Sequence, residues 1–151
     1  MNWDEFFFDM IDIIKTKSKD RATKVGTVIV SSDNAVLSIG FNGFPRGVND
    51  DVDERHERTP KGKYLWTEHA ERNAIYNAAR HGIILEGSRI YLDFYPCARC
   101  ARAIIQSGIA EIVIDGRDYE EKTKYWMERW KDTMEVSKEM LEESEVKIRK
   151  T

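Results

Sequence analysis

Cysteine and proline are scarce in this chain, which has two cysteines and three prolines among 151 residues. Both cysteines, Cys97 and Cys100, stand in a single C-x-x-C. In a cytosolic chain this spacing favours metal binding or redox chemistry over a structural disulfide. Long apolar runs are also missing, because no stretch approaches the ~18 residues that a membrane-spanning helix requires. We therefore expect neither a disulfide framework nor a membrane protein.

An excess of positive charge is missing as well. The net charge is −3 and the isoelectric point is near 5.7, whereas a protein that binds a nucleic-acid backbone normally has a basic face. Lysine and arginine are scattered, with small clusters only at 15–21 and 147–150. The first residues, 1–5, are acidic where a signal peptide would be basic. These features predict a cytoplasmic protein with a small-molecule substrate and without a nucleic-acid partner.

The first half of the chain predicts a helix, a hairpin and a long loop. Apolar residues at i, i+3, i+4 and i+7 spacing predict an amphipathic helix over 3–17. The β-branched run 25–30 and its partner 35–41 predict a hairpin. The polar segment 42–64 predicts a long loop, and loops of this length in compact domains are often functional.

The second half alternates helices with strands. We expect a helix over 68–80 that is capped by Thr67, a helix over 97–106 with Pro96 at its head, and a charged helix over 119–142. Strands are expected at 89–94, at 110–114 and, as an exposed edge, at 145–150. The order α-β-β-α-β-α-β-α-β predicts one three-layer α/β domain, 1–151, around a five-stranded mixed sheet.

Two short motifs carry the chemistry, and together they describe a catalytic zinc site. His69 offers an imidazole, and Cys97 and Cys100 lie at i and i+3 on one face of a helical first turn. A catalytic zinc takes three protein ligands and keeps a fourth position for water, whose pKa falls to roughly 7. Glu71, two residues after the histidine, can transfer protons without binding the metal. This H-x-E…P-C-x-x-C arrangement is the signature of zinc-dependent nucleobase deaminases.

Each motif alone has a plainer explanation. A C-x-x-C can be a redox pair or half of a structural zinc site, and a His-x-Glu triplet occurs by chance. Both together, each at a predicted helix start, favour the catalytic site. A closed structural site would need a fourth Cys or His, and neither His56 on the loop nor His81 at the far end of its helix is a convincing candidate.

The chain resembles the cytidine/deoxycytidylate deaminase superfamily, and within it the deoxycytidylate (dCMP) deaminases. The resemblance extends over about 18–115. It is carried by the strand entry 19–26, by the loop 40–47 with Asp50 and Asp51, by the zinc motifs 69–75 and 96–101, and by the segment 104–109. The resemblance implies a cytidine-deaminase-like α/β/α fold and hydrolysis of dCMP to dUMP and ammonia, which feeds thymidylate synthesis.

The resemblance also implies roles for individual residues. One Zn²⁺ is held by His69, Cys97 and Cys100, with Glu71 as the proton donor. The sugar is met by Asn42, and the base lies beside Ala70, Tyr95 and Pro96. Tyr95 departs from the family, in which many members have a small hydroxyl or acidic residue before the proline.

Many members of this family are hexamers that dCTP activates and dTTP inhibits. The resemblance therefore implies a homo-oligomer with an effector, accompanied by Mg²⁺, near the loop that holds Gly43, Arg46 and Gly47. Arg46 and the N–H groups of the two glycines suit a phosphate, although an arginine in a turn is as readily solvated. With only two cysteines, the chain lacks ligands for the second, structural zinc that some members carry.

Three alternatives stay open from the sequence. A deaminase of tRNA or another polynucleotide would share the motifs, but the acidic isoelectric point counts against it. A catalytically silent zinc module would have no need of Glu71. A deaminase of free cytidine differs only in substrate, so a comparison of cytidine, dCMP and dCTP separates it from a nucleotide deaminase.

Overall fold

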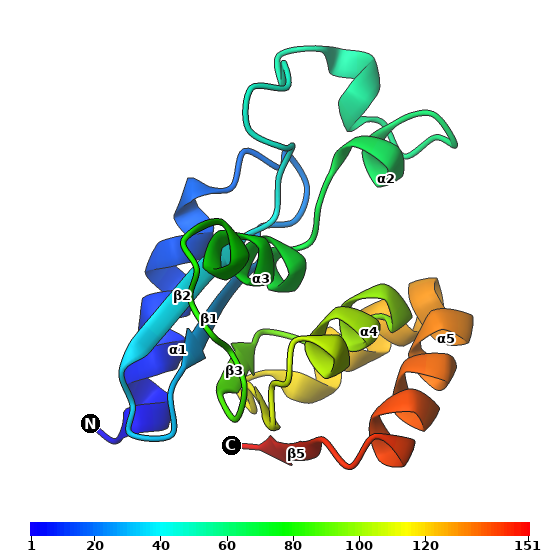
Figure 1. The fold of residues 1–151 in the computed structure, drawn as a ribbon. Coiled ribbons are helices and arrows are strands. Elements are labelled where there is room, and N and C mark those ends of the chain that lie inside the picture. Colours follow the sequence, from blue (N-terminus) through cyan, green and yellow to red (C-terminus); the bar gives the residue numbers. More distant parts are fainter.

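The computed structural model describes residues 1–151, and a single mixed sheet organises them (Figure 1). The strand order is β2-β1-β3-β4-β5. The strands are β1 (Gly26–Val30), β2 (Val36–Phe41), β3 (Arg89–Leu92), β4 (Glu111–Ile114) and β5 (Lys147–Lys150). β1 runs antiparallel to β2 and β3, whereas β3, β4 and β5 are parallel. The predicted five-stranded mixed sheet is confirmed.

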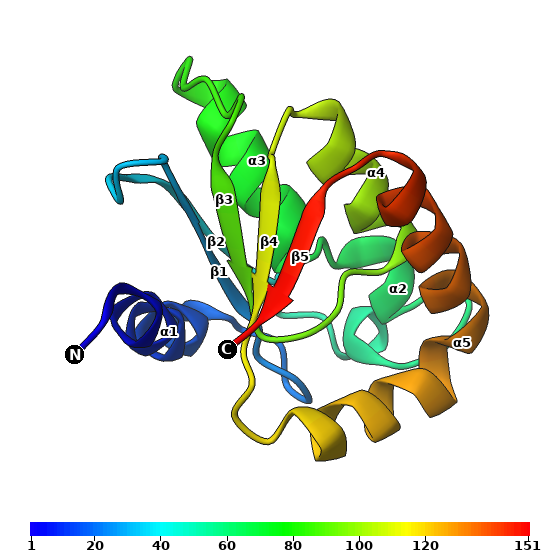
Figure 2. The same cartoon turned by 90° about the horizontal axis from the view of Figure 1, so that it is seen from below.

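Helices cover both faces of this sheet, which confirms the predicted three layers (Figure 2). The helices are α1 (Trp3–Ile14), α2 (Lys63–Trp66), α3 (Ala70–Arg80), α4 (Ala98–Gln106) and α5 (Tyr119–Glu143), with 3₁₀ turns η1 (Lys15–Lys17) and η2 (Asp53–His56). α1 lies on one face, and α3 and α4 lie on the other. None of the helices is both long and apolar enough to cross a membrane.

The period-two alternation of the strands divides the core between the two faces. One cluster joins α1 to alternate strand residues; it consists of Phe7, Phe8, Ile11, Ile14, Val28, Val30, Tyr91 and Val113. The intervening strand residues Ile29, Ile90, Leu92, Ile112 and Ile114 face α3 and α4, where they pack with Ala74, Ala78, Ala101 and Ile104. The three central strands, β1, β3 and β4, are buried on both faces because helices cover both.

Three local expectations are corrected. Thr67 does not cap the third helix: its N–H is bonded to Lys63 O as the end of α2, and His69 is the N-cap residue of α3. The segment 42–64 is not one loop, since it contains η2 and the start of α2. The last helix is not continuous, because Trp130 has φ −128° and ψ 24°, which bends α5.

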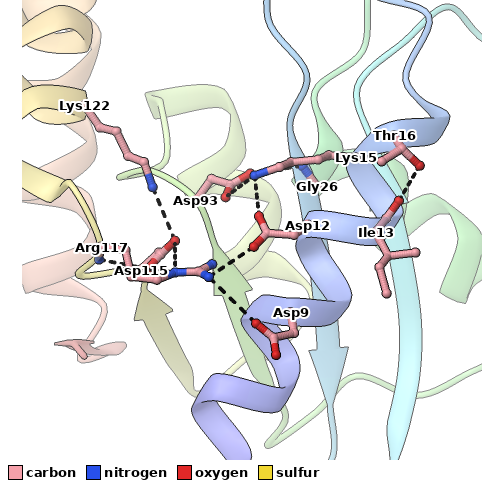
Figure 3. A network of polar contacts seen from close by, with 10 residues as sticks. All are labelled: Asp9, Asp12, Ile13, Lys15, Thr16, Gly26, Asp93, Asp115, Arg117 and Lys122. Atoms are coloured by element: carbon pink, nitrogen blue, oxygen red, sulfur yellow. Dashed lines mark hydrogen bonds and ion pairs between the residues drawn. The ribbon is translucent and has the colours of Figure 1, made fainter.

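A polar network ties α1 and the start of α5 to the carboxyl ends of β3 and β4 (Figure 3). The buried Asp115, one residue after β4, accepts from Arg117 Nε at 3.0 Å and pairs with Lys122 Nζ at 3.3 Å. The buried Asp93, one residue after β3, lies 3.7 Å from Lys15 Nζ. Residues of α1, η1 and α5 are thus held at the end of the sheet from which the chain continues into α4 and α5.

Candidate functional site

Two helix N-termini bring the three predicted metal ligands together. His69 is the N-cap residue of α3, Cys97 is the N-cap residue of α4, and Cys100 lies in the first turn of α4. His69 Nδ1 is 3.6 Å from Cys97 Sγ and 3.5 Å from Cys100 Sγ. All three donor atoms lie within 4.8 Å of one another.

This spacing fits a tetrahedral zinc ion. Metal–ligand lengths of about 2.3 Å to sulfur and about 2.05 Å to nitrogen separate the two atoms by about 3.6 Å at a tetrahedral angle. The two observed N···S distances, 3.6 and 3.5 Å, agree with that value. No fourth His, Cys, Asp or Glu belongs to the cluster, so the donor set is that of an open, catalytic site and not of a closed structural one.

The C-terminal helix holds the cysteine turn in place. Thr133 Oγ1 accepts a hydrogen bond from the N–H of Ala98 at 2.9 Å, which satisfies a free donor in the first turn of α4. Ser137 is fully buried and donates through Oγ to Pro96 O at 2.6 Å. The second half of α5 therefore fixes the residues on both sides of Cys97.

The two thiols are electrostatically unequal. The hydrogen bond from Cys100 and the neighbouring His69 lower the pKa of Cys97 to about 3, against the opposing effect of burial. The same hydrogen bond and burial raise the pKa of Cys100 well above its usual value. Thiolate is the form that binds metal, and the pair already stabilises one thiolate beside the imidazole.

Glu71 lies in the first turn of α3, one turn from the ligand cluster, and is buried at 9% exposure. Its side chain lines the same cavity as His69 and Cys97. Burial is the largest influence on this carboxyl and raises its pKa. Glu71 therefore adjoins the metal ligands without belonging to their cluster.

The cavity at the ligand cluster has a volume of about 100 Å³ and an aromatic wall. Phe94, Tyr95, Trp126 and Trp130 form much of this wall, and the ring centroids of Phe94 and Trp126 lie 4.9 Å apart. Aromatic rings in the wall suit a planar heterocycle, which stacks on aromatic faces.

The residues expected to meet the substrate are only partly brought to this cavity. Ala70, Asn42 and Tyr95 line it, whereas Pro96 does not. The amide of Asn42 is largely committed to the protein. Its Oδ1 accepts from Ser18 Oγ at 2.8 Å and from Val25 N at 2.9 Å, and its Nδ2 donates to Thr23 O at 2.8 Å. One amide N–H of Asn42 is left to meet a ligand.

The residues expected to bind an effector lie outside this cavity. Gly43 donates its N–H to Glu68 O at 3.1 Å, so that donor is not free for a phosphate. Arg46 Nη2 donates to Asn77 Oδ1 at 2.6 Å, on an exposed side of α3. Gly47 has φ +79°, a conformation that favours glycine.

Several residues of the cavity were not found from the sequence. Arg58, Lys63, Tyr125 and Arg129 line it, although they lie outside both motifs. Trp126 and Trp130 of the helix expected over 119–142 also line the cavity. The i, i+1, i+4, i+5 spacing of the α5 positions 125, 126, 129 and 130 places these four side chains on one side of the helix.

Comparisons with known proteins agree with these features. Residues 1–115 match the family model described as the cytidine and deoxycytidylate deaminase zinc-binding region. An uncharacterized deaminase in the luxG 3′ region of Aliivibrio fischeri is 40% identical over 148 residues, which cover 97% of this chain and 91% of that protein. Human deoxycytidylate deaminase is 36% identical over 122 residues, which cover 79% of this chain and 67% of that protein. The chain spans 64% of a Drosophila melanogaster relative and 57% of a Caenorhabditis elegans relative.

Solved structures show the same fold. The dCMP deaminase of the cyanophage S-TIM5 in apo form superposes with a TM-score of 0.70 at 21% identity, covering 98% of this chain and 96% of that chain. The same phage enzyme in complex with dCMP and dUMP gives a TM-score of 0.71 at 21% identity, covering 97% of this chain and 95% of that one.

Proposed function

This chain belongs to the cytidine and deoxycytidylate deaminase family, and from that premise we propose that it is a zinc-dependent hydrolase that converts dCMP to dUMP and ammonia. The observation that carries the proposal is the three-ligand cluster of His69, Cys97 and Cys100, which opens into a cavity that also contains the buried Glu71. The substrate follows the name of the human relative, which is a deoxycytidylate deaminase.

His69, Cys97 and Cys100 would hold the metal. When bound in such a site, zinc lowers the pKa of water to roughly 7 and so supplies a nucleophile at neutral pH. The protein's own part is positional: two helix N-termini fix the ligands, and Thr133 and Ser137 of α5 fix the cysteine turn.

Glu71 would carry the protons. Deamination at C4 of cytosine requires one proton at ring nitrogen N3 and another at the departing 4-amino group. The Glu71 carboxylate would accept one proton of the attacking water and deliver it to N3. It would then take the proton of the new C4 hydroxyl and deliver it to the 4-amino group, so that the C4–N bond breaks, ammonia leaves and the C4 carbonyl forms. Its position in the cavity, one helical turn from the ligands and without a charged partner of its own, supports this role.

The cavity wall would orient the base. Phe94 and Trp126 offer ring faces to the pyrimidine, and the backbone at Ala70 lies beside the ligand cluster. Packing of the base against this wall excludes water from the reacting atoms, which strengthens the electrostatic interactions there. One N–H of Asn42 remains for the sugar.

Variants that separate metal binding from proton transfer test the proposal. Glu71→Gln is expected to bind one zinc per chain and to lose about 10²- to 10⁴-fold in kcat on dCMP, whereas His69→Ala is expected to lose the metal. Zinc is measured by atomic emission and turnover by ammonia release. Glu139→Gln, an exposed carboxyl on α5, is the matched control and should behave as the wild type. Near-normal turnover by Glu71→Gln would refute the assignment.

Finer properties follow from the same family membership. We propose one domain over 1–151, a homo-oligomer of hexameric type in the cytoplasm, and a product that supplies thymidylate synthesis. We also propose activation by dCTP and inhibition by dTTP with Mg²⁺. Support for a separate effector site comes from Arg46 and Gly47, which lie outside the catalytic cavity. Equilibrium sedimentation and assays with each triphosphate test these properties.

A further inference from the structure

We propose that Arg58 and Arg129, which meet at the hydroxyl of Tyr125, form an anion subsite that restricts the deaminase to pyrimidine nucleoside monophosphates. This inference rests on the proposed deaminase function and adds the residues that select the phosphorylated substrate. These residues lie apart from both zinc motifs, and two of them lie on α5, beyond the residues 1–115 that match the family model.

The three side chains converge on one point of the catalytic cavity. Arg129 Nη1 donates to Tyr125 Oη at 2.6 Å, across one turn of α5. Arg58, from the segment before α2, is the other cation near the Tyr125 hydroxyl, and its influence is the main cause of the lowered pKa of Tyr125. All three residues line the cavity that contains His69 and Glu71.

The charges of both arginines are uncompensated. The ion pairs of the molecule include neither Arg58 nor Arg129. The third cation of the cavity, Lys63, is neutralised by the buried Asp20 at 2.7 Å. Two guanidinium groups that share one neutral hydroxyl repel each other, and an anion between them would remove that repulsion. Phosphate suits them best, because arginine binds its oxygens in a bidentate manner.

A third donor belongs to a residue of the same cavity. The indole Nε1 of Trp130 is buried and has no hydrogen-bond partner, and its ring lines the same cavity. Indole nitrogen donates only, and a buried donor without an acceptor costs free energy. Phosphate oxygen is an acceptor that would satisfy it. The unpartnered indole is therefore an observation, independent of the arginines, that points to a hydrogen-bond acceptor bound in this cavity.

The bend in α5 places this subsite. Non-helical torsions at Trp130 turn the first half of α5 around α2 (Figure 2). The ring centroids of Trp130 and of Tyr64 in α2 lie 5.3 Å apart. The first half is tied to the sheet by Lys122 Nζ and Asp115 Oδ2, 3.3 Å apart (Figure 3). Tyr125 and Arg129 thus project from a fixed segment toward Arg58.

The charge of the subsite indicates a single phosphate. A phosphate monoester carries about −1.5 to −2 charges at pH 7, which two arginines balance. Lys63 is not free to balance more, because Asp20 holds it from both carboxylate oxygens, at 2.7 and 2.9 Å. A triphosphate or a polynucleotide would place further charges beyond the donors.

Substrate pairs that differ only in the phosphate test the subsite. Zinc-loaded wild type, Arg58→Gln and Arg129→Gln are assayed with dCMP and deoxycytidine. Each variant is expected to lose about tenfold in kcat/KM for dCMP, mainly through KM, and to keep the wild-type value for deoxycytidine. Lys124→Gln is the control, because it removes a positive charge from an exposed position of α5 that does not line the cavity; it should match the wild type on both substrates.

Several outcomes would overturn the proposal. These are an equal loss on dCMP and deoxycytidine, no loss on dCMP, or a wild type that deaminates oligo(dC) or dCTP better than dCMP. If the wild type deaminates none of these compounds, the proposed function fails by itself. Calorimetry with dUMP and deoxyuridine then still decides the subsite: wild type should bind dUMP about tenfold or more tightly than either arginine variant does, and equal binding refutes it.

Discussion

Gly40 is the position at which a single methyl group should disturb the whole site. β2 and α3 approach so closely there that a Cβ on Gly40 would lie 2.2 Å from Ala70 O and 2.5 Å from Ala74 N. Both are backbone atoms of α3, so no side-chain rotation can relieve the overlap. We therefore expect Gly40→Ala to push the N-terminus of α3 away from the sheet.

The size of this displacement follows from the contact distances. Real Cβ atoms essentially never approach a heavy atom closer than 3.0 Å, so the contact of 2.2 Å must lengthen by at least about 0.8 Å. Ala70 adjoins His69 and Glu71, and a misplacement of about 1 Å can cost 10²-fold in rate. Overpacking of this kind also costs about 1–3 kcal/mol of stability, which lowers Tm by roughly 4–8 °C at 2 kcal/mol in a chain of this size.

Three measurements on Gly40→Ala check this reasoning. Zinc per chain under competition with a chelator should fall, kcat/KM on dCMP should fall about 10²-fold, and Tm should fall as stated. Gly43→Ala adds the same methyl three residues further on, where no atom lies within 4 Å. It should keep all three values when no effector is added. Wild-type zinc retention and rate in Gly40→Ala would show that α3 is not held by this contact.

Two buried carboxylates should give opposite pH dependences of stability. Burial tends to raise the pKa of Asp20, but the hydrogen bond from Lys63 and two backbone N–H groups outweigh it, so the folded pKa lies below the unfolded value. Its stabilisation is present above the unfolded pKa and is lost as the pH falls through the folded pKa. Asp20→Asn removes the partner of Lys63, whose side chain is only 13% exposed. The substitution should therefore lower the free energy of unfolding by about 3 kcal/mol at pH 7 and by progressively less below pH ~4. Urea unfolding at a series of pH values measures this, and a stability difference between wild type and variant that does not change with pH would contradict the pairing. Burial raises the pKa of Asp93, so ionisation of this carboxyl costs stability as the pH rises from the unfolded pKa through the folded pKa. Asp93→Asn should therefore gain stability relative to the wild type between pH 4 and pH 7, and a gain that is equal at both pH values would contradict the assigned cause.

The sequence was informative where structure and chemistry are local. The β-branched residues 27–30 and the apolar residues 112–114 predict strands, and their unbroken apolar character agrees with burial on two faces. The metal ligands are equally predictable from the sequence. Cys97 and Cys100 stand at i and i+3, and both they and His69 stand at the starts of predicted helices.

Other features depend on packing between segments that are distant in the sequence, and the spacing of residues along the chain does not reveal such packing. Thr67 has the side chain of a helix cap, but the preceding turn of α2 uses its N–H and leaves His69 at the N-cap position. Asn42 has the side chain of a ligand contact, yet three protein groups occupy most of its amide. Trp126 and Trp130 line the cavity beside a bend of α5 at Trp130, which the helical pattern over 119–142 does not reveal.

The two halves of α5 have different roles: one supports the metal site, and the other contributes to the proposed selection of the substrate. The second half, through Thr133 and Ser137, supports the turn that carries Cys97, so it is bound to the metal site and cannot vary without disturbing it. The first half contributes Tyr125 and Arg129 to the cavity wall, and no hydrogen bond joins it to His69, Cys97 or Cys100. The bend at Trp130 separates these two tasks. Substitutions before the bend can therefore change which substrate is admitted while the zinc ligands and the proton-transferring carboxyl keep their positions.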